Sequence, residues 1–416
     1  MKKILVVLVL LAGLWVGCSV DSSQTIHYSV NEPVFTSPET FRRSIRITSE
    51  AHALGDCGKI GFYNHYLYIS EPGKGIHIID NTHPAQPQNK GYIEIPGHQD
   101  LIIRNHYLYV DALVDLVWFD LSHPAQPVLQ GRAENLFPAA LPVIDNSYGY
   151  DYELYQKGIA QGQIVTGWQL KERKEQNAYK NYQEDGFAST TLSQGNALNA
   201  MTQSSTSHFA LSDDYLYAAI NQYIHIIDLS GEKPEKVADN VYVGHVETIL
   251  PYHAQLFLGT SSGLVIYSIE EPQRPAYFSQ IPHVYGCNPI AIDNDMAYIS
   301  VRSGNLCGQT TNELIIIDVS HAKQPQTLVS YKMQHPKGLG IDKGLLFVCD
   351  EGLKIFQTGK PETLMANSLG HFKEIIGNRV IPFNNMLLLI SDKGLYQYDY
   401  SDGNIRLISI IPIQKQ

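Results

Sequence analysis

The sequence predicts an all-β protein: a seven-bladed β-propeller of four-stranded antiparallel blades with one long loop insertion. Three observations predict this fold. A unit of paired strands recurs about every 40 residues, which is the length of a propeller blade. Apolar residues alternate at period two, and no segment keeps a long 3.6-residue pattern. Turns bounded by proline separate the units, as expected between short antiparallel strands.

Each unit contains an aromatic strand, a short turn and an apolar strand that usually ends in Asp. The seven copies are 66–68 with 75–80, 107–109 with 115–120, 215–217 with 223–228, 256–257 with 263–268, 297–298 with 313–318, 346–347 with 352–357, and 387–388 with 394–399. Their last residues are 40, 108, 40, 50, 39 and 42 positions apart, so two of the steps contain insertions. A strand before the aromatic one (99–104) and a strand after the proline turn (90–95) complete a four-stranded blade.

The turns after the apolar strands repeat one solution. Residues 80–87, 120–127 and 318–325 each begin with Asp and end with Pro. The Asp side chain can accept backbone N–H groups of the turn, while Pro fixes φ and removes a donor that would lack a partner. We therefore interpret these Asp residues as structural and not as acids of a reaction.

These strands carry a family resemblance. Ile-His-Ile-Ile-Asp (76–80) and Leu-Ile-Ile-Ile-Asp (314–318), each followed by Ser or Thr and a proline turn, resemble the LVIVD-repeat family of secreted bacterial β-propeller lipoproteins. The resemblance covers about residues 60–399 and implies the fold but no particular chemistry. WD40 repeats are the second possibility, because they also contain Gly-His pairs such as 97–98 and 244–245. This chain has no Trp-Asp pair, so the WD40 resemblance is weaker.

The N-terminus predicts export and membrane attachment. Two lysines, an apolar run and Gly17-Cys18 indicate a lipoprotein signal peptide over 1–17, and the apolar run is short for a membrane span. The cleavage site resembles the bacterial lipobox, which implies lipidation of Cys18; Trp15 departs from that pattern, so cleavage without lipidation stays an alternative. We expect a flexible tether over 18–40 and an outer-membrane lipoprotein of the cell envelope.

The composition limits the possible partners, and the number of cysteines limits the possible disulfides. Lys+Arg 30 against Asp+Glu 41 gives a net charge of -11, which disfavours nucleic acid. Cys57, Cys287, Cys307 and Cys349 allow three pairings, of which Cys287 with Cys307 is the candidate disulfide, because it would join an expanded loop to its own blade. Cys57 and Cys349 are either paired or free thiols.

One loop face is expected to be functional because it receives both insertions, 136–207 between blades 2 and 3 and 302–312 inside blade 5. The first half of the long insertion is aromatic and can pack, whereas the second half is polar and is expected to be mobile. The aromatic residues either contact a partner or a sugar ring, or simply cover the propeller. The candidates on this face are Asp111, Asp115, Tyr150, Tyr152, Trp168 and Arg302.

A second set of candidates lies at the starts of the blades, where it would ring the channel mouth. It consists of Cys57, His98, His245 and His335. His and Cys are typical ligands of transition metals, but residues of non-adjacent blades seldom come within about 2.0–2.3 Å of one ion, so no metal or other cofactor is predicted. The favoured interpretation is that these four are turn residues encoded by the repeat, and a metal site is the alternative.

The predicted function is a non-enzymatic binding or assembly module, with a protein or glycan bound at the loop face. The sequence contains no Gly-x-Ser-x-Gly, His-Glu-x-x-His or phosphate-binding glycine motif. The alternative is a glycan-directed hydrolase or lyase that uses acids and histidines of the channel mouth. The closure of the ring stays open, because residues 43–48 or 404–411 could supply the outer strand of the last blade.

Overall fold

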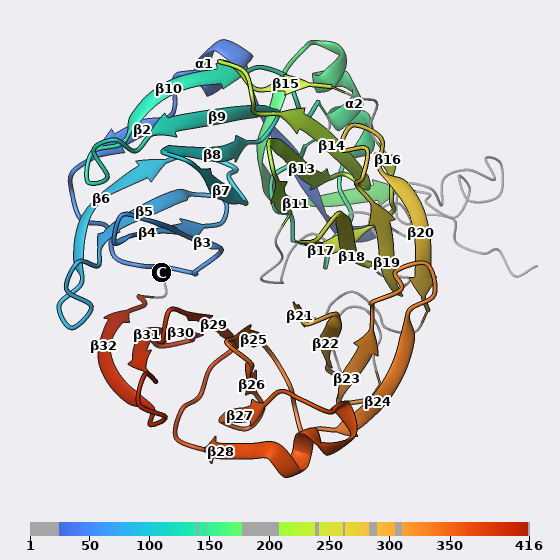
Figure 1. Ribbon diagram of the computed structural model, residues 1–416. Helices are drawn as coiled ribbons and strands as arrows, with labels where there is room; N and C mark the ends of the chain where they lie inside the picture. The colour runs from blue at the N-terminus through green and yellow to red at the C-terminus, as the bar shows by residue number, and fades with distance from the viewer. Residues whose placement is uncertain are drawn as a thin grey trace, which may run out of the picture.

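Seven antiparallel sheets surround a central channel in the computed structural model (Figure 1). The structure describes residues 25–138, 140–145, 147–176, 208–237, 241–260, 263–282, 289–303 and 310–414. Each blade contains four strands in sequence order, which confirms the predicted seven-bladed propeller. No helix in these ranges is long and apolar enough to cross a lipid bilayer.

The strands of each blade run outward from the channel. Blade 1 is β3 (Ile60–Tyr63), β4 (Tyr66–Glu71), β5 (Gly75–Asp80) and β6 (Gln88–Glu94); blade 2 is β7 (Leu101–Arg104), β8 (Tyr107–Ala112), β9 (Asp115–Asp120) and β10 (Val128–Ala133). Blade 3 is β12 (Phe209–Ser212), β13 (Tyr215–Ile220), β14 (Tyr223–Asp228) and β15 (Glu235–Lys236), with β16 (Val241–Tyr242) also paired to β14.

The remaining blades repeat this order. Blade 4 is β17 (Val246–Tyr252), β18 (Gln255–Thr260), β19 (Gly263–Ser268) and β20 (Ala276–Ile281); blade 5 is β21 (Ile290–Asp293), β22 (Met296–Val301), β23 (Glu313–Asp318) and β24 (Gln326–Lys332). Blade 6 is β25 (Leu339–Asp342), β26 (Leu345–Cys349), β27 (Leu353–Gln357) and β28 (Ser368–Phe372), preceded by the short helix η1 (Pro361–Asn367). Blade 7 is β29 (Arg379–Phe383), β30 (Met386–Ser391), β31 (Gly394–Asp399) and β32 (Arg406–Pro412).

The two middle strands of a blade are buried on both faces because every blade packs between two neighbours. In β4, for example, Leu67 faces the cluster shared with blade 7, and Tyr68 faces the cluster shared with blade 2. Seven apolar clusters of this kind fill the seven interfaces between blades. Burial of apolar side chains on both faces of these strands stabilises the ring, and this explains why the strands are almost continuously apolar.

The Asp residues that end the apolar strands hold the following turns, as predicted. The backbone N–H of Ser122 donates to Asp120 Oδ1 at 2.6 Å, and that of Ser320 donates to Asp318 Oδ1 at 2.9 Å. Hydrogen bonds from Ser122 hold the pKa of Asp120 below its usual range. These acids are structural parts of the repeat.

The C-terminal strand of the chain closes the ring. Strand β32 is the outer strand of blade 7, whereas β2 (Arg46–Thr48) pairs with β6 as a fifth strand of blade 1. No strand is exchanged between the first and last blades within the described residues. The seam is held by an apolar cluster, a parallel bridge between Leu54 and Ile413, and reciprocal amide hydrogen bonds between Asn81 and Gln397 at 2.9 and 2.8 Å.

The flexible tether expected over 18–40 is wrong for its described part. Residues Thr25–Thr36 form strand β1, which pairs antiparallel with β11 (Ile164–Gln176) of the long insertion, and helix α1 (Pro38–Arg42) follows. The partner strand lies far away in the sequence, so no local pattern indicated it. The first half of the insertion packs as expected, with helix α2 (Tyr152–Ala160) before β11. Residues 177–207 of its second half, Cys18, Cys287 and Cys307 lie outside the described residues.

Candidate functional site

The N-terminal strand and the insertion form one unit on the loop face, which we call the ribbon module and define as β1, residues 140–145 and 147–151, α2 and β11. Asn31 of β1 lies at its centre and is buried. Its backbone N–H donates to the Gly149 oxygen at 2.8 Å, and its side-chain amide donates to the oxygens of Asp145 and Tyr148 at 2.8 and 3.0 Å. Strand β1 is therefore held along both edges, by β11 and by residues 149–151.

The predicted aromatic residues of the insertion come together within the ribbon module. The ring of Tyr150 packs edge to face against Tyr152, Tyr155 and Trp168 at centroid distances of 6.2, 5.8 and 5.5 Å. Trp168 Nε1 also donates to the Pro142 oxygen at 3.0 Å. Burial raises the pKa of Tyr150 to about 12, whereas Tyr152 stays 37% exposed. Tyr150 and Trp168 thus support the module, and Tyr152 is presented to solvent.

Asp115 attaches helix α1 to blade 2. Its fully buried carboxylate accepts from Arg42 Nε at 2.9 Å and from Arg132 Nη1 at 2.8 Å. The backbone N–H of Asn135 donates to the same group at 2.8 Å. All of these partners come from the protein itself, so Asp115 is a buried structural anchor in this arrangement.

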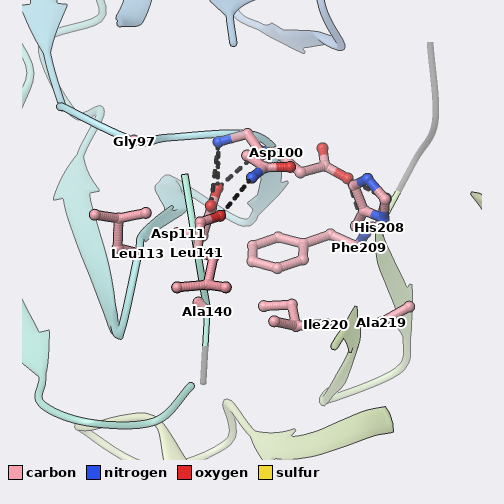
Figure 2. Close-up of a pocket in the computed structure, with 11 residues that line it drawn as sticks. Gly97, Asp100, Asp111, Leu113, Ala140, Leu141, His208, Phe209, Ala219 and Ile220 are labelled. Carbon is pink, nitrogen blue, oxygen red and sulfur yellow. Dashed lines mark hydrogen bonds between the residues drawn. The ribbon is translucent and has the colours of Figure 1, made fainter. Parts of the chain in front are cut away.

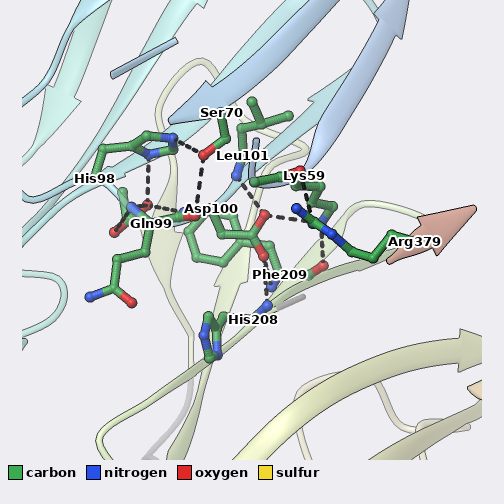
Figure 3. Close-up of polar contacts among 11 residues, drawn as sticks. Lys59, Ser70, His98, Gln99, Asp100, Leu101, His208, Phe209 and Arg379 are labelled. Carbon is green, nitrogen blue, oxygen red and sulfur yellow. Dashed lines mark hydrogen bonds and ion pairs between the residues drawn. The ribbon is translucent and has the colours of Figure 1, made fainter. Parts of the chain in front are cut away.

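His98 lies between Ser70 and Asp111, and Figure 3 shows its contact with Ser70. Its Nε2 lies 2.7 Å from Ser70 Oγ, and its Nδ1 lies 3.1 Å from Asp111 Oδ1. Because a carboxylate only accepts, Nδ1 carries a proton, and in the neutral ring Nε2 accepts from Ser70. The hydrogen-bonded order Ser70, His98, Asp111 matches that of a catalytic Ser-His-Asp triad. However, Ser70 and His98 are 0% exposed, and Asp111 also accepts the backbone N–H groups of Gln99 and Asp100.

Asp100 fixes the point at which the insertion returns to the propeller. Its carboxylate accepts the backbone N–H groups of His208 and Phe209 at 2.6 and 2.8 Å. Lys59 Nζ of blade 1 lies 3.3 Å from the same carboxylate and donates to the Phe209 oxygen at 2.9 Å. Burial lowers the pKa of the His208 imidazole. Blades 1, 2 and 3 are therefore linked at the channel mouth by this group of contacts (Figure 3).

A small cavity lies beside this network, between blades 2 and 3 (Figure 2). Carboxylates of Asp100 and Asp111 line one part of it, and apolar side chains such as Leu113 and Ile220 line another. Its volume of about 20 Å³ is enough for one water molecule and is far below the several hundred Å³ of a typical small-molecule site.

The remaining candidates do not converge. Cys57 is buried and free, and burial raises the pKa of its thiol to about 12; Cys349 is likewise buried and free. His335 is exposed and His245 is partly exposed. His335 lies between β24 and β25 and His245 between β16 and β17, whereas His98 lies between β6 and β7. Arg302 is partly exposed at the end of β22. Within the described ranges, no group of three or more His, Cys, Asp or Glu residues is arranged to hold a metal ion.

Sequence reasoning missed several polar residues of the channel mouth, namely Lys59, Ser70, Asp100, Lys337 and Arg379. A shared position could have revealed some of them. Lys59 and Asp100 directly precede the inner strands of their blades, and Arg379 is the first residue of its inner strand. Because the inner strands surround the channel, a charged residue at their start lies at the mouth.

Comparisons with known proteins agree with the fold. The family model named LVIVD repeat matches residues 97–134 and 204–232, which contain blade 2 and the first three strands of blade 3. A comparison with curated proteins gave no significant match. Many solved structures are similar at the level of the fold.

Three of these solved structures illustrate the likeness. The computationally designed Ika8 protein has a TM-score of 0.50 at 10% identity, covering 88% of this chain and 91% of its own. Sqt1 of Saccharomyces cerevisiae has a TM-score of 0.49 at 7% identity and 88% coverage of both chains. Hsv2p of Kluyveromyces lactis has a TM-score of 0.48 at 11% identity, covering 86% of this chain and 97% of its own. At these identities the likeness concerns the fold alone.

Proposed function

We propose that this seven-bladed β-propeller with LVIVD repeats is a lipid-anchored, non-enzymatic assembly module of the bacterial cell envelope, which binds a partner protein through its ribbon module. One observation carries the proposal: the module presents a set of large hydrophobic side chains to solvent. They are Val34, Val143, Tyr148, Tyr152, Ile159 and Leu170, each 37–46% exposed. Exposed aromatic and aliphatic groups are typical of protein-binding surfaces. The register of β1 with β11 places Val34 and Leu170 on opposite faces of this ribbon, so the proposed surface extends over both faces.

The expected position of the lipid anchor, close to β1, supports binding through the ribbon module. If Cys18 carries the lipid, only residues 19–24 separate it from Thr25, the first residue of β1. An extended chain spans at most about 3.6 Å per residue, so the seven steps from Cys18 to Thr25 reach about 25 Å. The ribbon module would then be the part of the protein tied most directly to the membrane, and a partner in or on the membrane would lie within its reach.

The hydrolase alternative has weaker support. Ser70, His98 and Asp111 have the order of a catalytic triad, but a nucleophile must contact its substrate, and Ser70 is 0% exposed. The nearby cavity of about 20 Å³ is too small for a sugar ring. We therefore interpret these three residues as a hydrogen-bonded link between blades 1 and 2.

Crosslinking in intact cells of the native host, followed by affinity purification, tests the proposal. The test variant replaces three exposed residues of the ribbon module by serine: Tyr148, Tyr152 and Leu170. The matched control replaces three similarly exposed residues on the outer strands of blades 4, 5 and 6: Tyr277, Leu328 and Leu369. We expect one partner protein to be crosslinked to the wild type and the control but lost from the test variant.

Two further results would contradict the proposal. Equal loss of the partner from both variants would place binding elsewhere on the propeller. Incorporation of labelled fatty acid into a Cys18→Ser variant would contradict lipidation at Cys18, whereas loss of the label together with release into the soluble fraction is expected. These two readouts test the binding face and the anchor separately.

A further inference from the structure

Cationic side chains from three consecutive blades lie at the channel mouth on the loop face. Lys337 precedes the inner strand of blade 6, Arg379 begins that of blade 7, and Lys59 precedes that of blade 1. The inner strands of a propeller surround its channel, so these positions lie on the same rim. The chain as a whole has a net charge of -11, so these three cations are opposite in sign to its overall charge.

Contacts between the segments that carry the three cations place them along one arc of the rim. Lys337 Nζ donates to Asn378 Oδ1 at 2.7 Å, and Asn378 is the neighbour of Arg379. The Arg379 guanidinium donates to the main-chain oxygen of Gly58 at 3.1 Å, and Gly58 is the neighbour of Lys59. Figure 3 shows Arg379 extending from its strand towards Lys59.

These charges are only partly balanced by acids of the protein. Lys59 pairs with Asp100 at 3.3 Å. By contrast, no ion pair formed among the described residues includes Lys337 or Arg379. Among the described residues, Arg379 donates to the neutral main-chain oxygens of Cys57 and Gly58. Desolvation is the largest effect on its pKa and lowers it, while the nearby Asp56 partly opposes this shift. Desolvating a cation that has no directly bonded counter-charge is unfavourable, and a bound anion would offset that cost.

We propose that Lys337 and Arg379, with Lys59 beside them, form a binding site for an oxyanion group, the phosphate or carboxylate of a small ligand, at the channel mouth. Arg379 has five N–H donors in a planar fork, and its two main-chain contacts leave donors for the oxygens of such a group. Lys337 adds a positive charge on a flexible side chain. To contact the ligand it has to give up only its hydrogen bond to the amide oxygen of Asn378.

The chain offers a closely matched control for Lys337. Lys343 makes the same kind of contact between the same two blades, with its Nζ 2.9 Å from Asn385 Oδ1. Lys343 and Asn385 lie in turns between the first and second strands of their blades, on the opposite face of the propeller. A variant of Lys343 therefore removes an equivalent charge and an equivalent hydrogen bond away from the proposed site.

Isothermal titration of the full chain in detergent with inorganic phosphate, at constant ionic strength, tests the site; sodium acetate serves as the carboxylate probe. We expect saturable binding of one phosphate to the wild type and to Lys343→Met, and at least about tenfold weaker binding to Lys337→Met. A Lys337→Arg variant retains the charge and should bind within a few-fold of the wild type. Binding of acetate as well would extend the site to carboxylates, whereas binding of phosphate alone would restrict it to phosphoryl groups.

Two outcomes would overturn the proposal. One is that neither probe binds the wild type saturably. The other is that Lys337→Met and Lys343→Met weaken binding equally, because a general loss of surface charge would then account for the effect. Circular dichroism of each variant confirms that the compared proteins are folded.

Discussion

Replacing Asp115 by Ala should destabilise the propeller more than any loss of an exposed acid. The change removes a fully buried carboxylate and leaves Arg42 and Arg132, whose side chains are 20% and 13% exposed, without their shared partner. Removing one member of a buried ion pair costs about 3–5 kcal/mol, and the partial exposure of the two arginines places the expected loss near the lower end, about 3 kcal/mol. For a chain of about 400 residues, with an unfolding entropy of about 2.1 cal/mol/K per residue, this lowers Tm by about 4 °C.

Thermal unfolding followed by tryptophan fluorescence measures this effect, because Trp118 lies on the same strand, β9, as Asp115. Glu134→Ala is the matched control. Glu134 pairs with the same Arg42 at 2.7 Å but is 54% exposed, so its removal should cost less than about 1 kcal/mol. The reasoning is refuted if Asp115→Ala lowers Tm no more than Glu134→Ala does.

Two other variants test buried polar groups by urea unfolding. Ser70→Ala removes the hydroxyl that bonds the buried His98 and should cost about 1–3 kcal/mol while leaving partner crosslinking unchanged; loss of crosslinking in a folded variant would argue instead for a direct role. Burial lowers the pKa of His225 to about 4. The unfolded chain, with an ordinary His pKa near 6.5, therefore takes up the proton first, so stability falls as pH drops from about 6.5 to 4, by about 3 kcal/mol in total. His225→Phe should lack that part of the decline, and an unchanged pH profile would show that His225 does not cause it.

The blade count could be predicted because its information is local. Asp80, Asp120 and Asp318 each mark a strand end and hold the next turn, so the spacing of such residues counts blades directly. The pairing of β1 with β11 could not be predicted in this way. Asn31 meets Leu170 across more than 130 residues, and neither strand carries the repeat pattern.

The acids of the loop face show a second limit of sequence reasoning. Loop acids are usually solvated, yet Asp111 and Asp350 are buried and accept backbone N–H groups of the segments that lead into the inner strands. Asp111 is the next-to-last residue of β8 and Asp350 directly follows β26, so their place at the end of the second strand of a blade could have identified them. The grouping of Lys337 with Arg379 depends instead on which blades are neighbours in the closed ring, and the sequence shows that only after the fold is known.

The seam between the first and last blades has a consequence for how the protein is made. The chain is synthesised from its N-terminus, so residues 379–412 of blade 7 are made after the other six blades. Until then, Ile69 and its neighbours on blade 1 have no Leu388 or Ile390 to cover them. The incomplete chain is therefore an open arc with an exposed apolar edge, and a chaperone that shields this edge would protect it from aggregation until blade 7 is complete.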